Sequence, residues 1–210
     1  GNFSTARGFA SFSGARGRLD YNLFAEQFAT EGQGVNDAYS NSFQGAKVGV
    51  LLAPRVFFNF RTRHSNSRSG VQSFWKFNGQ PLLPPDADQR ARQNNFLAGA
   101  DISLAAPARW QHRFAGFEYN HRRLNFDQVA DRGCAPPLFL DCDFSDLLTV
   151  NRAGFDYQGE YWLRSWTRSS FGYQFEDENG FVNQDFSGFK DSSHGLRRNH
   201  SLFAQQVVTR

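Results

Sequence analysis

The sequence predicts an all-β protein, folded as an antiparallel up-and-down meander of about nine strands. Two observations predict this class. Apolar and polar residues alternate with a period of two along many segments, which is the pattern of a strand with unlike faces. The 210-residue chain also contains 24 Phe and 19 Gly but no Met, a composition that favours strands over helices. No stretch approaches the roughly 18 consecutive apolar residues of a membrane-spanning helix.

The first two strands are expected at residues 5–14 and 18–30. Alternation is weak in the first. In the second, Leu19, Tyr21 and Leu23 share one parity, and polar residues take the other. The turn residues between the two segments support a hairpin.

The next two strands are expected at residues 41–53 and 56–65, on either side of a turn that contains Pro54. The second of them, VFFNFRTRHS, has an apolar and a polar parity: Phe58, Phe60 and Thr62 against Asn59, Arg61 and Arg63. We expect these two sets of side chains to lie on opposite faces of the sheet.

Five further strands are expected at residues 96–105, 110–126, 149–163, 167–176 and 196–208. The first has the clearest alternation in the chain, and the last is ambiguous in phase. In the strand at 110–126, the pattern assigns Ala115, Phe117 and Tyr119 to the apolar face. All seven prolines fall in the expected connections, which agrees with the exclusion of Pro from strand interiors.

The expected connections alternate in length along the chain. Short ones lie near residues 14–17, 53–55, 105–109 and 163–166, and long ones near 31–40, 66–95, 127–146 and 177–195. An up-and-down meander places successive connections at opposite ends of the sheet. One end should therefore have tight turns and the other end large loops.

The alternation suits a soluble antiparallel sheet as well as the wall of a membrane barrel. Three features favour the barrel. The apolar face is rich in aromatic residues and lies opposite a polar face of mixed charge, and the loops are sorted by length. In addition, Trp110, Trp162 and Trp166 lie beside short turns, where an interfacial aromatic girdle would lie. Because a bilayer does not tolerate unpaired strand edges, we expect residues 1–210 to be one partial domain of a large transmembrane β-barrel. The start Gly-Asn-Phe, without an initiator Met, agrees with an excised piece.

Two stretches resemble the barrel of TonB-dependent outer-membrane receptors. The stretch GRLDYNLFAEQFATEGQGVNDAYSNSFQGAKVGVLLAPRVFFNFRTRHSNSRSG is similar to the early barrel hairpins of that family, and RRNHSLFAQQ is similar to a mid-barrel strand. The resemblance implies a barrel of about 22 strands with an N-terminal plug, in the bacterial outer membrane. It also implies import of a scarce small molecule, such as a siderophore-iron complex or cobalamin, with energy supplied by TonB through the plug. This sequence contains no plug, no TonB-contacting box and no later strands.

Two other functions remain open at this stage. A passive porin-like channel would use the same wall without a plug, and a soluble β-sandwich binding module would use the same alternation. The expected partners of a receptor are outer-membrane lipid, a small-molecule ligand and TonB. Nucleic acid is not expected, because the net charge of +3 comes from scattered residues without a basic block.

The chain has few candidate functional residues. Cys134 and Cys142 lie in one long connection and are expected to form a disulfide, because an even cysteine count is typical of extracytoplasmic proteins. Nearby, Asp141, Asp143 and Asp146 could supply oxygen ligands for calcium, but their spacing does not match the twelve-residue calcium loop. We therefore expect no metal site and no cofactor.

Ligand-binding residues are only weakly indicated. The candidates are Trp75 and Phe77 in a long loop, and Arg61 and Arg63 on the polar face. Arg152 and Glu160, also on that face, are candidates for contacts with a plug. No spacing of His residues for a metal, nucleophile motif or phosphate loop indicates catalysis, so we expect that the protein is not an enzyme.

Overall fold

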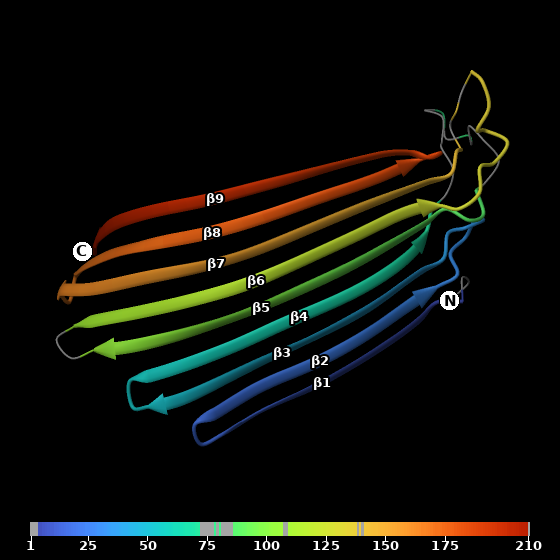
Figure 1. Cartoon of the computed structure of the whole chain (residues 1–210). Coiled ribbons are helices and arrows are strands. Elements are labelled where there is room, and N and C mark those ends of the chain that lie inside the picture. Colours follow the sequence, from blue (N-terminus) through green and yellow to red (C-terminus); the bar gives the residue numbers. More distant parts are fainter. Residues whose placement is uncertain are drawn as a thin grey trace.

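The computed structural model describes residues 4–71, 78, 80, 86–106, 109–137, 139 and 141–209. In this part of the chain, nine strands form one sheet in which every strand pairs antiparallel with the next (Figure 1). The strands are β1 (Ala6–Arg16), β2 (Leu19–Thr30), β3 (Tyr39–Ala53), β4 (Val56–Gly70), β5 (Arg90–Ala106), β6 (Trp110–Asp127), β7 (Phe144–Arg164), β8 (Thr167–Phe186) and β9 (Phe189–Val208). The predicted all-β meander is confirmed. The sheet is open, with β1 and β9 at its two edges.

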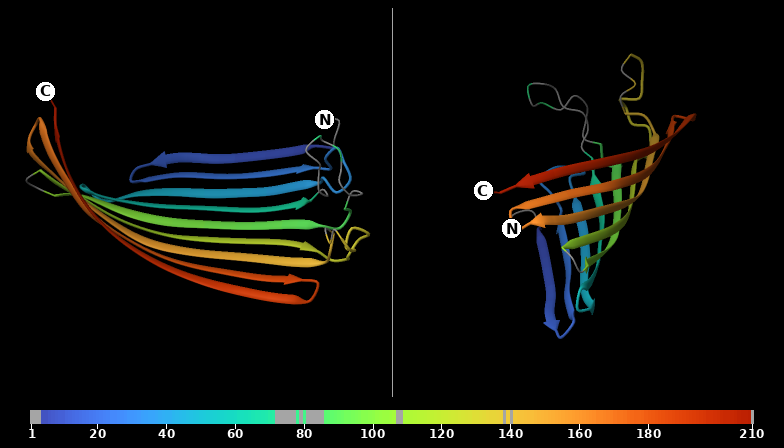
Figure 2. Two further views of the ribbon diagram at one scale, coloured as in Figure 1. Left: turned by 90° about the horizontal axis from the view of Figure 1, so that it is seen from above. Right: turned by 90° about the vertical axis from the view of Figure 1, so that its left-hand side faces the viewer.

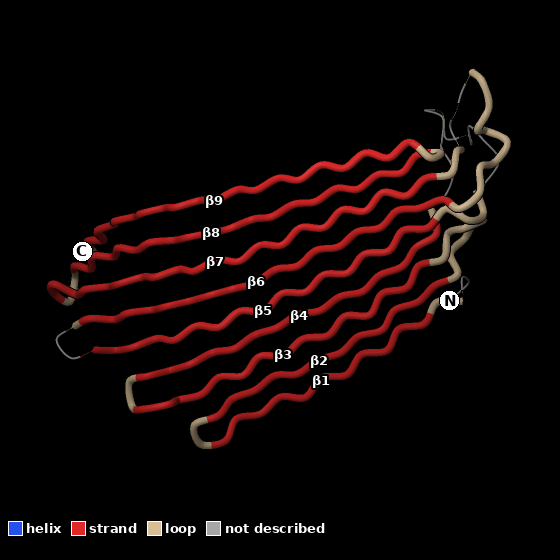
Figure 3. The backbone as a smooth tube through the Cα atoms, viewed as in Figure 1, coloured by secondary structure: helices blue, strands red, loops and turns tan. Residues whose placement is uncertain are grey.

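The connections are sorted by length between the two ends of the sheet (Figure 3). Tight turns at residues 17–18, 54–55 and 165–166 lie at one end. The connections 31–38 and 128–143, the described residues of the connection between β4 and β5, and the short turn at 187–188 lie at the other. Gly17 has a positive φ of 61°, which a glycine adopts without strain in such a turn. The candidate loop residues Trp75 and Phe77 lie outside the described residues.

The predicted long connection at residues 177–195 is wrong. There β8 and β9 continue to a tight turn at Ser187 and Gly188, both with positive φ. Polar residues occupy both parities in this region and hide the alternation that marks a strand. Cross-strand ion pairs accompany the ladder instead: Arg198 to Asp177 at 2.8 Å, Arg197 to Glu178 at 2.9 Å and Lys190 to Asp185 at 3.8 Å.

The register divides the side chains between two faces, because directly paired residues point to the same side. One row across the sheet defines the apolar face: Tyr21, Val48, Phe60, Ala100, Gly116, Phe155, Phe175 and His200. The neighbouring row defines the polar face: Asn22, Lys47, Arg61, Gly99, Phe117, Gly154, Glu176 and Asn199. The predicted division of β4 between Phe60 and Arg61 is confirmed.

The predicted phase of β6 is wrong. Ala115 pairs with Asp101, and Phe117 pairs with Gly99, so Ala115, Phe117 and Tyr119 lie on the polar face. The apolar face instead receives Phe114 and Gly116. Phe117 lies over Gly154 of β7, where the missing side chain leaves room for the ring. An aromatic residue on the polar face thus misled an assignment based on hydrophobicity alone.

The sheet has no second layer among the described residues, and it is twisted and curved (Figure 2). Within this part of the chain, Cys142 is the single buried apolar side chain, at 4% exposure. On the apolar face, Leu23, Phe60, Phe155 and Phe171 are all between 37% and 43% exposed. The apolar face is therefore uncovered. No helix in the described residues is long and apolar enough to cross a membrane.

The strand ladders shift register at two places among the described pairs. One lies between Leu51 and Ala53, at the turn into β4, and the other between Trp162 and Arg164, at the turn into β8. Both are at the end of the sheet with tight turns. Elsewhere the pairings between described strands continue without a shift.

Candidate functional site

Asp101 is the centre of a charged group on the polar face. The Asp101 carboxylate is 3.7 Å from the Arg61 guanidinium and 3.5 Å from that of Arg113, and it accepts a hydrogen bond of 3.1 Å from Asn59 Nδ2. Asp101 is 6% exposed, so its charge needs these partners. Three adjacent strands, β4, β5 and β6, supply the group.

A hollow of about 640 Å³ lies over this part of the polar face. Its polar lining residues are Asn22, Lys47, Asn59, Arg61, Thr62, Arg63 and Asp101. The structure therefore brings together the two arginines singled out from the sequence. Three cationic side chains and one carboxylate give the hollow a positive charge, which favours anionic groups.

A second group of charges crosses β7, β8 and β9 on the same face. Arg152 contacts Glu176 at 2.8 Å and Glu178 at 3.2 Å, and Arg197 contacts Glu178 at 2.9 Å. Glu160 pairs with Arg168 at 3.6 Å, nearer the tight turns. The contacts of Arg152 and Glu160 are thus with neighbouring strands of this sheet.

At the long-loop end, Cys134 and Cys142 form a disulfide within the connection 128–143. Two backbone hydrogen bonds fix the same segment: Asp131 N–H donates to Asp141 O, and Cys134 N–H donates to Asp131 O, both at 2.9 Å. The disulfide and these bonds hold Asp131 beside Asp141. The backbone around both residues is therefore held in place by the protein itself.

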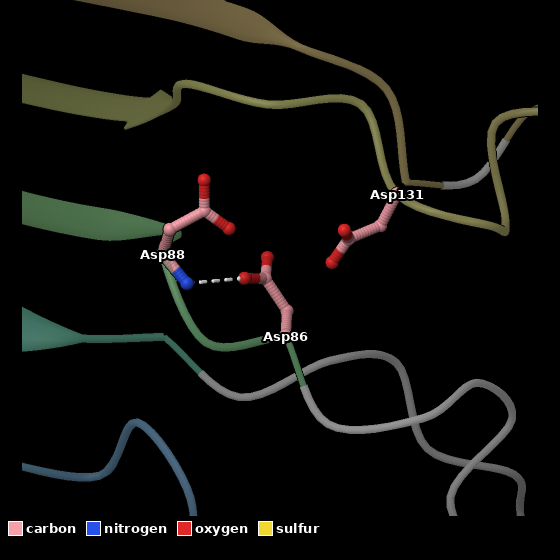
Figure 4. A group of neighbouring side chains, drawn as sticks. All are labelled: Asp86, Asp88 and Asp131. Carbon is pink, nitrogen blue, oxygen red and sulfur yellow. Dashed lines mark hydrogen bonds between the residues drawn. The ribbon is translucent and has the colours of Figure 1, made fainter.

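The same end contains a cluster of five carboxylates, here called the acidic cluster: Asp86, Asp88, Asp127, Asp131 and Asp141. They form two overlapping groups, Asp86 with Asp88 and Asp131, and Asp86 with Asp127 and Asp141; in each group one oxygen per residue lies within 4.8 Å of the others. Figure 4 shows the carboxyl groups of the first group converging. Asp86, Asp127 and Asp141 are 1%, 5% and 7% exposed.

Asp141, Asp143 and Asp146, the three aspartates considered from the sequence as calcium ligands, do not lie together in the structure. Asp143 accepts a hydrogen bond from Ser187 at 2.9 Å, and Asp146 is 3.4 Å from Arg123, so only Asp141 belongs to the acidic cluster. Asp86 and Asp127 were missed because they lie in other parts of the chain. Only the pairing of β5 with β6 brings the ends of these connections together.

Burial and mutual repulsion raise the carboxyl pKa values in the acidic cluster. Asp127, the last residue of β6 at the long-loop end, has its pKa raised to about 6, first by burial and then by the charge of Asp86. Burial also raises the pKa of Asp141 and of Asp88. Asp37 is the opposite case: backbone N–H groups of Gln33 and Gly34 lower its pKa.

No protein-family model matches this sequence, and no curated protein matches it.

Proposed function

We propose that this sheet is part of the wall of a β-barrel in a bacterial outer membrane, belonging to a TonB-dependent receptor that imports a scarce nutrient. The observation that carries the membrane part is the uncovered apolar face. Large apolar side chains of this face are exposed on β2, β4, β7 and β8, while the described residues contain almost no apolar core. Lipid is the medium in which such a face is stable.

The distribution of charge along the apolar face supports this proposal. On β7 the apolar residues of this face extend from Tyr161 to Phe155, which is about 20 Å of strand at roughly 3.3 Å per residue. Beyond them, polar and charged residues occupy the same face, as at Glu118 on β6 and Asp177 on β8. An apolar band with polar strand ends beyond it is the arrangement of an outer-membrane barrel.

Aromatic residues border the band near the tight turns. Trp110 contacts Tyr161 and Phe171 with ring centroids 4.7 and 6.0 Å apart, and it stacks on His112 at 5.7 Å. His112 also shares a hydrogen bond of 3.0 Å with the Tyr157 hydroxyl. Rings with one polar atom are favoured at the boundary between lipid and water.

The polar face supports a lumen. It combines Lys47, Arg61 and Arg63 with carboxylates such as Asp101 and Glu176, and a bilayer would not tolerate these on its side of the wall. The assignment to a TonB-dependent receptor, importing a siderophore-iron complex or a cobalamin-like ligand, rests on the resemblance of the hairpins at residues 17–70. The cationic hollow would attract anionic groups of such a ligand.

The membrane topology is tested by single cysteines at Phe60 and Arg61, each in the protein embedded in vesicles. A membrane-impermeant maleimide should label Arg61→Cys through the lumen but leave Phe60→Cys protected, because lipid covers the apolar face. A bilayer-soluble maleimide should reverse this order. Equal labelling of both positions by the impermeant reagent would contradict the proposal and favour a soluble sheet.

A separate measurement distinguishes the receptor from a passive channel. A plugged receptor should show no steady ion conductance in planar bilayers and should import its ligand only in cells that have TonB. Steady conductance without TonB would identify a porin-like channel. That outcome would agree with a membrane barrel but would contradict the assignment to a TonB-dependent receptor.

A further inference from the structure

The acidic cluster lies where two separate connections meet. Asp86 and Asp88 come from the connection that precedes β5, Asp127 ends β6, and Asp131 and Asp141 lie in the connection that follows. Figure 4 shows Asp131 facing Asp86 and Asp88 from the opposite side. The cluster is therefore an interface between connections 71–89 and 128–143.

One carboxylate oxygen of Asp86 is buried without a hydrogen-bond donor among the described residues. Asp86 Oδ1 accepts hydrogen bonds from the backbone N–H groups of Asp88 and Gln89, at 2.8 and 2.9 Å. Asp86 Oδ2 is fully buried, and it has no hydrogen-bond donor among the described residues. It belongs to a side chain that is 1% exposed and lies among other carboxylates. An unpaired buried carboxylate oxygen is costly.

No cation of the protein compensates this charge within the described part of the chain. The ion pairs of the described residues include none of the five carboxylates, whereas Asp101 and Asp146 each have an arginine nearby. Three largely buried carboxylates close to one another would repel strongly in this environment. Among the described residues, only a bound cation or bound protons would compensate this charge.

We propose that the acidic cluster binds a calcium ion, with Asp86, Asp127 and Asp141 as its principal ligands. Two ligands on opposite sides of a calcium ion lie about 4.8 Å apart, so carboxylate oxygens within 4.8 Å of one another need only small side-chain movements to bind one ion at about 2.4 Å. The groups consist of aspartates alone, so they offer the hard oxygen ligands that calcium prefers. Magnesium retains several waters and is commonly bound through one or two carboxylates, which suits this site less well.

The ion would join the two connections over the loop end of the sheet. The disulfide and the Asp131 N–H to Asp141 O hydrogen bond already fix one half of the site. The backbone bonds to Asp86 Oδ1 fix the other half. Calcium would bridge two halves that are each ordered locally. Calcium binding at this site does not depend on whether the sheet lies in a membrane.

The test is a calcium titration of the purified protein by isothermal titration calorimetry, after treatment with EDTA and removal of the chelator. We expect one calcium ion per chain at neutral pH, with a dissociation constant on the order of 10⁻⁴ M or tighter. Asp86→Asn retains an oxygen for the two backbone donors but removes the charge, and it should weaken binding about tenfold or more. Asp143→Asn, in the same connection but outside the cluster, should bind as the wild type does.

Limited trypsin digestion provides a second readout if a variant folds poorly. Calcium should slow cleavage after Arg132, which is exposed beside Asp131, in the wild type and in Asp143→Asn but not in Asp86→Asn. Cleavage after Arg55, at the opposite end of the sheet, should not respond to calcium. The proposal is overturned if the wild type binds no calcium at 10 mM, roughly a hundredfold above the expected constant, or if folded Asp86→Asn binds it as well as the wild type.

Discussion

The ring of Phe117 on β6 lies over Gly154 on β7, on the polar face of the sheet. A Cβ added to Gly154 would overlap that ring, whereas a Cβ at Gly116, the neighbour of Phe117, would meet only a carbonyl oxygen at 3.6 Å. The two glycines are in the interior of adjacent strands and differ in what covers them. This difference permits a matched test.

Gly154→Ala should destabilise the sheet by about 1–3 kcal/mol, because the Phe117 ring must leave its position. Gly116→Ala should be close to neutral, since its new methyl group makes an ordinary contact. The measurement is the free energy of unfolding in denaturant for both variants. Equal effects would show that Phe117 does not occupy the space above Gly154.

Phe60→Arg should destabilise the protein in bilayers by about 2–4 kcal/mol, because Phe60 is near the middle of the proposed lipid-facing band of β4. Gln174→Arg is the control: it places the same side chain on the polar face, beside Asp156 on the paired strand. It should change stability little. Refolding into phosphatidylcholine vesicles provides the free energies. A neutral Phe60→Arg beside a costly Gln174→Arg would mean that the apolar face does not meet lipid.

Arg152 and Glu176 should be coupled energetically by about 1 kcal/mol, because their 2.8 Å contact is partly shielded from water. A double-mutant cycle with Arg152→Met and Glu176→Gln measures the coupling. The coupling should decline as salt increases. A coupling near zero at low salt would show that these groups are solvated separately.

Calcium binding should weaken as pH falls through about 6. The pKa of Asp127 is raised to about 6 from 3.8 by burial and by Asp86, and burial raises those of Asp88 and Asp141 as well. Because these folded-state values exceed the unfolded ones, protons stabilise the ion-free cluster increasingly as pH falls from above 6 toward 4. Those protons compete with calcium.

Two measurements check this pH dependence. Calcium affinity at pH 5 should be lower than at pH 7.5. Trypsin cleavage after Arg132 without calcium should be slower at pH 5.5 than at pH 8, once the intrinsic pH dependence of trypsin is corrected with the Arg55 site. Affinity that rises on acidification would contradict a site made of these carboxylates.

Replacing Cys134 and Cys142 with serine should weaken calcium binding while leaving the β-sheet circular dichroism unchanged. The disulfide closes only the segment that carries Asp141, and it makes no contribution to the strand ladders. Calcium titration and far-ultraviolet spectra of the double variant test the two effects separately. Loss of the β-sheet circular dichroism signal would show that the disulfide also stabilises the sheet.

The sequence predicted the sheet well because alternation and turn residues are local signals. Segments with one apolar parity, such as Phe58 to Thr62, were assigned to the correct faces. The prediction of a long connection at 177–195 was wrong because strands that are polar on both sides have no period of two. The prediction that Phe117 lies on the apolar face was wrong because its ring packs over a glycine of the neighbouring strand, which the sequence of β6 alone does not show.

The candidate site was predicted only in part. Arg61 and Arg63 lie together because their spacing of two is visible in one strand. Asp86 comes from the connection before β5 and Asp127 ends β6, and the pairing of β5 with β6 is what brings them together. A search for neighbouring carboxylates along the chain finds Asp141, Asp143 and Asp146 instead. Two of these have partners elsewhere.

The register shifts at the turns into β4 and β8 have a consequence for insertions and deletions. Since successive residues point to opposite sides, a slip of β4 by one residue against β3 would move Arg61 and Arg63 to the apolar side of the wall. The irregularity between Leu51 and Ala53 takes up one unpaired residue beside the turn, so β4 keeps its pairing. The connections 31–38 and 128–143 lie outside the strand ladders, so changes of length should be tolerated best there.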